Sequence, residues 1–361
     1  MDFIINLQDN AIIHADIICF LNRKDYWFKE RKNMCKNSKD VNAEKMNGTI
    51  DIVKYLMAIL VIGIHTEPFG FNFWLDKGFG IITRLCVPFF FIASSYFFFR
   101  KEKAAKEFIG RIVLLYIVWS IIYLPFDINE LREVSLFQLL DIFLWSGNDH
   151  GLWFLCATII GFLITYGLLK IMKPRYVLIV ALVMLIIGTA KSTYSTAFYE
   201  VFGILLPDNL GSRNGLFYGF PYIALGMVIA KSKNQGKTDS IKKLYVGFGI
   251  SLLMLAIESS LFVIRYNATS TILWLSVFTY SYFFFMIANN TNIVIHKKYA
   301  LLLRKMSTLL YVSQFLFIPA LSTYFSTMSL FLTTVILTTV FSLVIIKVSE
   351  LRYLGFMKYL Y

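Results

Sequence analysis

Long apolar runs recur along almost the whole chain, and they constrain the fold more than any other feature of the sequence. One example, DIVKYLMAILVIGIHT at residues 51–66, approaches the ~20 residues that an α-helix needs to cross a bilayer. Of the 361 residues, 58% are hydrophobic and 16% are charged, whereas soluble proteins carry roughly a quarter charged residues. The alternating segments of ~10 residues that are typical of a membrane β-barrel are not seen. The predicted fold class is therefore all-α, a polytopic transmembrane helical bundle.

The distribution of lysine and arginine predicts how this bundle is oriented. With the N-terminus in the cytosol, basic loops such as RKEKAAKEFIGR and KSKNQGKTDSIKK are cytoplasmic, as the positive-inside rule requires. About ten spans with both termini cytoplasmic satisfy this bias, and the net charge of +13 is then explained without any binding of nucleic acid. The predicted spans are 50–66, 81–99, 109–126, 151–170, 176–190, 214–231, 243–264, 271–288, 308–325 and 330–347.

Three regions follow from this pattern. Residues 1–47 are charged and lack the layout of a signal peptide, so we predict a cytoplasmic, partly disordered tail, with a translation start at Met46 as an open alternative. Residues 48–350 form the predicted transmembrane domain, and residues 351–361 form a cytoplasmic C-terminal tail. The cysteines have no metal-ligand spacing, and we expect no metal; they are Cys19, Cys35, Cys86 and Cys156.

Ionisable side chains inside predicted spans are costly, and in membrane proteins they usually mark function. Each has an ordinary structural explanation when taken alone: an interfacial histidine, an arginine that snorkels to the membrane surface, or a carboxylate paired with an arginine. Five of them nevertheless come from five different spans and fall toward the outer side, which predicts one shared polar cavity. These are His65, Arg84, His150, Arg213 and Glu258. Arg111 lies at the inner start of the third predicted span instead, where a cytosolic anion would be met.

The polar residues stand within stretches that resemble the acyltransferase-3 family of bacterial membrane acyltransferases. The resemblance covers residues 49–347, and within the family it is nearest to the membrane domain of the vancomycin-resistance serine racemases and related O-acetyltransferase-like proteins. Two positions depart from the family pattern, Ser95 in place of a glycine and Gln314 where a histidine is frequent. The matching stretches are DIVKYLMAILVIGIHT, RLCVPFFFIASSYFFFRK, GRIVLLYIVW, HGLWFLCATIIGFLI and STLLYVSQFLF.

The resemblance implies an enzyme of the bacterial cytoplasmic membrane that moves an acyl group, usually acetyl, from cytosolic acyl-CoA to a hydroxyl of an envelope glycan or other acceptor. It implies that His65 is essential and that Arg84 and Arg111 match family arginines. A histidine can remove a hydroxyl proton at neutral pH. The predicted catalytic residues are His65, Glu67 and Glu258, and the predicted substrate-binding residues are Arg84, Arg111, His150, Trp153, Arg213, Asn214 and Gln314.

Two other functions fit the same residues. An outer cavity in which Arg213 and Glu258 grip a carboxylate and an amine would suit a transporter or binding protein for a small, serine-like amino acid. A structural partner in an envelope-synthesis complex would need the polar residues only for stability. Transport and acyl transfer differ in whether acyl-CoA is required, so uptake measured without acyl-CoA discriminates between them.

Overall fold

The structure is a computed structural model, and it describes residues 45–70, 72–100, 105–132, 134–147, 150–204, 211–232, 240–266, 273–351 and 353–361. The chain divides into two units, Met1–Met46 and Asn47–Tyr361. The predicted N-terminal tail lies almost entirely outside the described residues. Everything below concerns the second unit.

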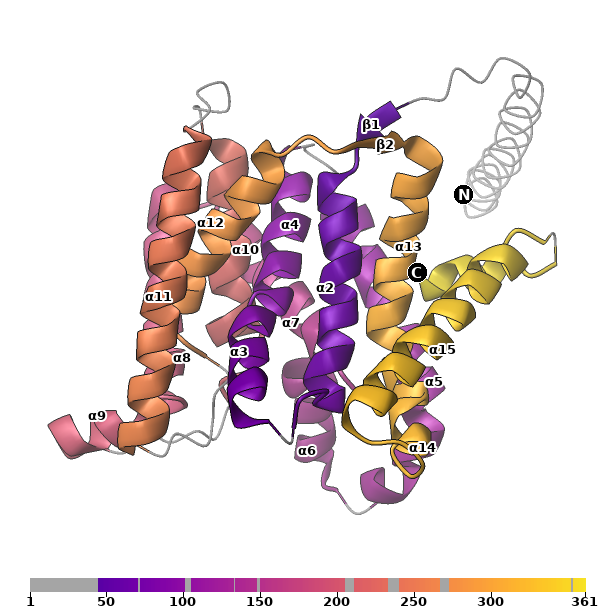
Figure 1. Cartoon of the computed structure of the whole chain (residues 1–361), viewed down its shortest axis with the longest axis horizontal. Coiled ribbons are helices and arrows are strands. Elements are labelled where there is room, and N and C mark those ends of the chain that lie inside the picture. The colour runs from indigo at the N-terminus through magenta and orange to yellow at the C-terminus, as the bar shows by residue number, and fades with distance from the viewer. Residues whose placement is uncertain are drawn as a thin grey trace, which may run out of the picture. The chain divides into compact units, whose positions relative to one another are not determined.

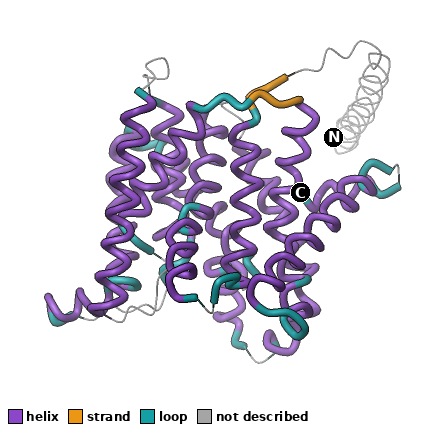
Figure 2. The backbone as a smooth tube through the Cα atoms, viewed as in Figure 1, coloured by secondary structure: helices purple, strands orange, loops and turns teal. Residues whose placement is uncertain are grey.

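Helices account for nearly all of the described part of this unit, as Figure 2 shows. The helices are α2 (Thr49–Thr66), α3 (Phe73–Thr83), α4 (Cys86–Arg100), α5 (Ala105–Leu131), α6 (Leu136–Asp141), α7 (Trp153–Leu168), α8 (Pro174–Lys191), α9 (Ser195–Phe202), α10 (Phe220–Lys231), α11 (Ile241–Tyr266), α12 (Ser276–Asn290), α13 (Lys297–Ser313), α14 (Ile318–Leu321) and α15 (Thr327–Val348). Two π-helical turns, η1 (Ile142–Ser146) and η2 (Gly215–Gly219), and two 3₁₀ turns, η3 (Gln314–Leu316) and η4 (Gly355–Leu360), adjoin them. The strands are β1 (Lys45–Asn47) and β2 (Val294–His296).

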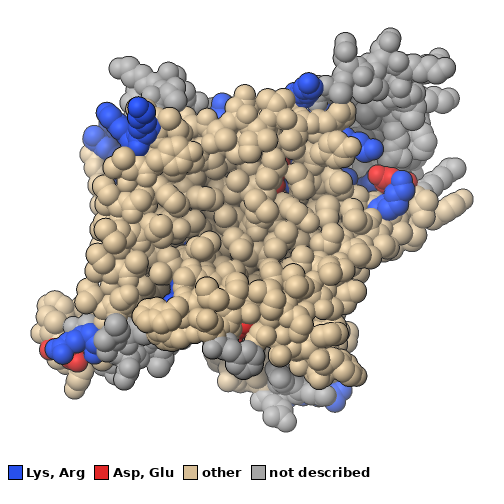
Figure 3. Space-filling model, in the orientation of Figure 1, with Lys and Arg blue, Asp and Glu red and all other residues tan. Residues whose placement is uncertain are grey.

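The longer helices run side by side, as Figure 1 shows. Six helical stretches among the described residues are long and apolar enough to cross a membrane, and three shorter apolar ones accompany them. In the face drawn in Figure 3, the blue and red residues gather toward the two ends, and most of the band between them carries no charge. The all-α polytopic class is therefore confirmed, while the number of ten spans stays a prediction. We name the ends of the bundle the Asp51 end and the His65 end, after residues in the first and last turns of α2.

Two predicted spans differ from the observed helices. The span predicted at 308–325 belongs to a helix, α13, that begins at Lys297 and gives way at Gln314 to the 3₁₀ turn η3. Its first turns contain KKYALLLRK, which falls between two predicted spans because its charged residues lower its hydropathy. The segment predicted as one span at 81–99 is divided between two helices, α3 and α4. Helix α3 already begins at Phe73, before the predicted start of the span.

Helices α4 and α10 approach each other closely, and small residues are required where they cross. Helix α10 packs along α4, and a Cβ atom on Gly226 would lie 2.4 Å from the carbonyl oxygen of Ile92. Beside it, the fully buried Ser95 donates a hydrogen bond from Oγ to the carbonyl oxygen of Ile223 at 2.5 Å. The serine that replaces the family's glycine thus joins α4 to α10 directly.

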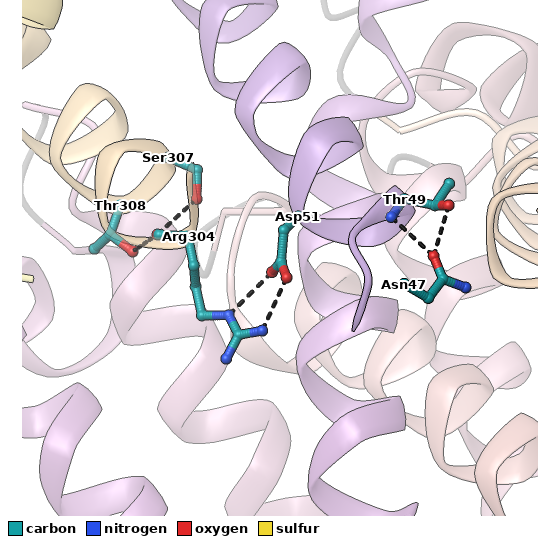
Figure 4. Close-up of polar contacts among 6 residues, drawn as sticks. All are labelled: Asn47, Thr49, Asp51, Arg304, Ser307 and Thr308. Carbon is teal, nitrogen blue, oxygen red and sulfur yellow. Dashed lines mark hydrogen bonds and ion pairs between the residues drawn. The ribbon is translucent and has the colours of Figure 1, made fainter. Parts of the chain in front are cut away.

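A bidentate ion pair joins α2 to α13 at the Asp51 end (Figure 4). Arg304 Nε lies 3.0 Å from Asp51 Oδ1, and Arg304 Nη2 lies 2.9 Å from Asp51 Oδ2. The Asp51 side chain is only 8% exposed, whereas that of Arg304 is 51% exposed. Because the carboxylate is buried, it depends on this fork of two charge-assisted hydrogen bonds. The pair explains why a charged stretch is helical here.

Removal of the buried charge tests this explanation. We expect Asp51→Asn to lower the free energy of unfolding by about 1–3 kcal/mol, because Arg304 loses a charge-assisted partner. The midpoint of thermal unfolding in detergent measures the effect. The matched control is Glu350→Gln, which removes an exposed pair with Lys347 at 3.5 Å and should change little. A double variant with Arg304→Gln should cost hardly more than either single change; additive losses would contradict the coupling.

Candidate active site

His65 lies at a junction between helices. It occupies the last turn of α2, and its ring meets that of Phe315, from η3, edge to face with centroids 4.7 Å apart. The charge of Arg213, which precedes η2, acts electrostatically on the same ring. His65 is exposed by surface area, but these contacts turn it toward other helices. Glu67, the helix cap, follows with a left-handed backbone (φ 45°), and its side chain is exposed.

Arginines from two other elements come together around Tyr218. The Arg213 guanidinium lies over the Trp153 ring, 5.2 Å from its centroid, and Trp153 stacks on Tyr218 at 5.8 Å. Tyr218 is buried and lies within electrostatic range of both Arg84 and Arg213. Four of the predicted residues, counting His65 with these two arginines and Trp153, are therefore brought into one neighbourhood.

His150 contacts the same phenylalanine, Phe315, as His65 does. Its Nε2 atom lies 2.5 Å from Asp127 Oδ1, and its ring stacks on Tyr123 at 4.6 Å. The Phe315 ring meets it edge to face at 5.9 Å. The sequence analysis expected His150 to share a cavity with His65, and both rings do contact Phe315, but it overlooked Asp127, which follows Pro125 near the end of α5. An aspartate in the last turns of an apolar helix was the signal for it.

The side chains of two other predicted residues cap the starts of helices. Both carboxylate oxygens of Glu258 accept backbone hydrogen bonds at 3.0 Å, from the amides of Leu275 and Ser276 at the start of α12. Asn214 Oδ1 likewise accepts from the amides of Leu216 and Phe217, at 2.9 and 3.0 Å. The first amides of a helix lack partners within it, so such contacts stabilise the helix. These contacts favour structural roles for Glu258 and Asn214, and their predicted roles at the site remain hypotheses.

Gln314 directly precedes Phe315, the residue that both His65 and His150 contact. It is fully buried and donates from Nε2 to the carbonyl oxygen of Tyr311 at 2.9 Å. Its Oε1 atom is buried without a hydrogen-bond partner among the described residues. The Tyr311 hydroxyl in turn donates to the carbonyl oxygen of Gly151 at 2.7 Å. This chain of contacts connects α13 to the turn that carries His150.

A cavity of about 520 Å³ opens at the Asp51 end. Three cationic residues line it, Lys54, Arg111 and Arg304, and Arg111 Nη2 donates to the backbone oxygen of Tyr361 at 3.2 Å. Sequence analysis identified Arg111 alone, because Arg304 falls between two predicted spans and Lys54 falls at the start of one. The other polar and aromatic lining residues include Ser94, Glu107, Thr158, Ser307, Thr308, Phe90, Phe154 and Tyr311.

Tyr311 relates this cavity to the His65 end. Its side chain is among the lining residues, its ring meets those of Phe90 and Phe154 at 6.1 and 5.2 Å, and it lies within electrostatic range of Arg213. Tyr311 thus connects the lining of the cavity with the surroundings of Arg213. Within the described residues, no group of three or more His, Cys, Asp or Glu side chains is arranged to hold a metal.

Comparison with known proteins gives a family and distant relatives. The family described as acyltransferase domain (Acyl_transf_3) matches residues 47–348. An amino-acid racemase of Enterococcus faecalis is 28% identical over 214 residues, 54% of this chain and 30% of the relative. A serine/alanine racemase of Enterococcus gallinarum is 27% identical over 237 residues, 59% of this chain and 33% of the relative. No solved structure matches the chain.

The chain spans about a third of the length of these curated relatives, so their names describe proteins that extend well beyond the part in common. The family match covers most of the chain, and it agrees with the apolar helices and with the motifs around His65 and Arg84. The chain therefore belongs to the acyltransferase-3 family, and its apolar helices indicate a multi-pass membrane protein.

Proposed function

We propose that the protein transfers an acyl group, most simply acetyl, from cytosolic acyl-CoA to a hydroxyl of an envelope glycan or another acceptor. The observation that carries this proposal is the cationic cavity at the Asp51 end, whose lining residue Tyr311 also lies within electrostatic range of Arg213. The donor would enter the cavity from the cytosol and the acceptor would meet it at the His65 end. This arrangement fits a protein of the bacterial cytoplasmic membrane with its Asp51 end inside.

The dimensions of α2 suit an extended donor. Lys54 and His65 are eleven residues apart on one helix, which corresponds to about 16 Å along its axis. The phosphates of CoA would lie near Lys54 and Arg111, whose positive charges attract phosphate. Arg304 lines the same cavity with two of its nitrogens already bonded to Asp51. The long pantetheine arm would then carry the thioester through the layer of Phe90, Phe154 and Tyr311. Small side-chain movements of these rings would open the way.

His65 would act as the general base. Its ring accepts the proton of the acceptor hydroxyl while that oxygen attacks the thioester carbonyl carbon. The carbon–sulfur bond then breaks, CoA leaves as a thiolate, and the proton held by His65 passes to the sulfur to give the free thiol. Arg84 and Arg213 would bind an anionic group of the acceptor or offset negative charge on the thioester oxygen. Glu67, two residues after His65, remains a hypothetical group for orienting the His65 ring.

Replacement of His65 tests the chemical step. We expect His65→Ala to lower the rate of acyl transfer by about 10²–10⁴-fold, the usual contribution of a general base. The measurement is transfer of label from acetyl-CoA by the full chain in lipid nanodiscs. His296→Ala is the matched control, because His296 caps the first turn of α13 at the Asp51 end. Full activity of the His65 variant would exclude the base role.

Replacement of Arg111 tests the donor site separately. We expect Arg111→Gln to raise the KM for acetyl-CoA about tenfold or more, because a hydrogen bond to a charged group is worth ~1.5–3 kcal/mol. The KM for the acceptor should stay unchanged. Arg175→Gln serves as the control, since Arg175 bonds the hydroxyl of Tyr176 on α8 and does not line the cavity. An equal change in both variants would argue against donor binding in the cavity.

Transport of a small amino acid is a second candidate, suggested by the similarity to a serine/alanine racemase. The cationic groups Arg84 and Arg213 would hold the carboxylate in this case. The test is uptake of labelled serine by vesicles that contain the protein but no acyl-CoA. Acyl transfer predicts no uptake above that of empty vesicles, whereas saturable uptake would favour transport and contradict the primary proposal.

A further inference from the structure

Asp127 and His150 form a pair at the His65 end that has no role in the proposed chemistry. The contact between His150 Nε2 and Asp127 Oδ1 measures 2.5 Å, and the side chains are 20% and 15% exposed. A pair of this kind in the last turns of an apolar helix is costly unless it has a use. Its position relative to His65 indicates what that use is.

The surrounding contacts hold the His150 ring in one place. Tyr123 stacks on one face at 4.6 Å, and its hydroxyl is itself fixed by donation to the carbonyl oxygen of Val312 at 2.7 Å. The next residue, Gly151, has φ +77°, and a Cβ atom there would lie 2.9 Å from the Phe315 ring. Glycine is therefore required at this turn. A site whose side chains are locked by packing before the ligand arrives binds it at lower entropic cost.

The two histidines contact one ring. Phe315 meets His65 at 4.7 Å and His150 at 5.9 Å, so the two imidazoles are no farther apart than these two distances combined. The cationic residues Arg84 and Arg213 gather around Tyr218, and Arg213 is the one that acts on His65. Asp127 supplies negative charge on the His150 side of Phe315. The region around His65 thus has groups of both signs.

We propose that Asp127 and His150 form the acceptor-positioning pair of this site. The inference rests on the proposed acyl transfer and deepens it. His150 would hydrogen-bond the acceptor, and Asp127 would act as a positioning residue by orienting the imidazole ring. Such a pair selects acceptors that carry a second hydroxyl or an amino group near the hydroxyl that receives the acyl group. The acceptor class is therefore a polyol, a sugar or an amino alcohol rather than a simple alcohol.

The test compares donor and acceptor kinetics in the full chain in nanodiscs. Labelled acetyl-CoA is the donor, and glycerol, N-acetylglucosamine and L-serine are the acceptor probes, with 1-propanol as the simple alcohol. The variants are Asp127→Asn, His150→Gln and the conservative Asp127→Glu. The control is Asp141→Asn, which removes an exposed carboxylate bonded to Ser146. Thermal unfolding of each variant is measured in parallel, so that loss of folding is recognised.

We expect Asp127→Asn and His150→Gln to raise the acceptor KM about tenfold or more and to leave the KM for acetyl-CoA unchanged. Asp127→Glu keeps the carboxylate, so its acceptor KM should lie between those of the wild type and Asp127→Asn. The preference for the three probes over 1-propanol should shrink in the two disruptive variants. Wild-type kinetics in both of those variants would overturn the assignment. An equal rise of donor and acceptor KM would also overturn it, since that pattern reports general damage.

A second readout separates this inference from the proposed function. Carbethoxylation by diethylpyrocarbonate, followed by mass spectrometry, reports the access of reagent to His65 and His150 with and without each probe. If the wild type transfers no acyl group, the proposed function fails, yet protection of both histidines by a probe still supports a shared binding site. Protection of His65 alone, or of neither histidine, would overturn the pairing of Asp127 with His150 as a binding element.

Discussion

The ion pair between Asp51 and Arg304 sets the relation between α2 and α13, and much of the site depends on that relation. The two oxygens of Asp51 are held by two nitrogens of Arg304, so sliding or rotation of one helix past the other breaks the fork. Each helix carries its functional residues at the opposite end: His65 on α2, and Phe315 in the turn that continues α13. The 4.7 Å contact between these rings is thus a consequence of a charged contact at the far end of the same helices.

The sequence was sufficient for the class of the fold, because that class follows from the cost of polar groups in lipid. Apolar length identified the helices, and the rarity of ionisable residues pointed to His65, Arg84, His150 and Arg213, which the structure brings near one another. The boundaries of α13 were not predictable by hydropathy. Arg304 makes its segment resemble a loop unless its partner Asp51, some 250 residues earlier in the chain, is known.

Glu258 shows where reasoning from sequence about single residues reaches its limit. A carboxylate inside an apolar helix suggests a functional group or a partner to an arginine, and both interpretations assume a side-chain partner. The structure supplies backbone amides instead, at the start of α12. The same holds for Asn214, whose oxygen serves the first amides of η2. Nothing in the local sequence reveals that a distant helix begins beside such a residue, because that depends on tertiary packing.

The tyrosine hydroxyls near the two histidines have a consequence for where mobile protons can reside. Tyr123 donates to the carbonyl of Val312 and Tyr311 donates to the carbonyl of Gly151, at places where the backbone leaves regular helix. Each phenolic hydrogen is therefore committed to an oxygen that would otherwise be stranded in an apolar interior. The two phenols therefore have a structural role, and in the proposed mechanism the mobile proton is held by the imidazole of His65 instead.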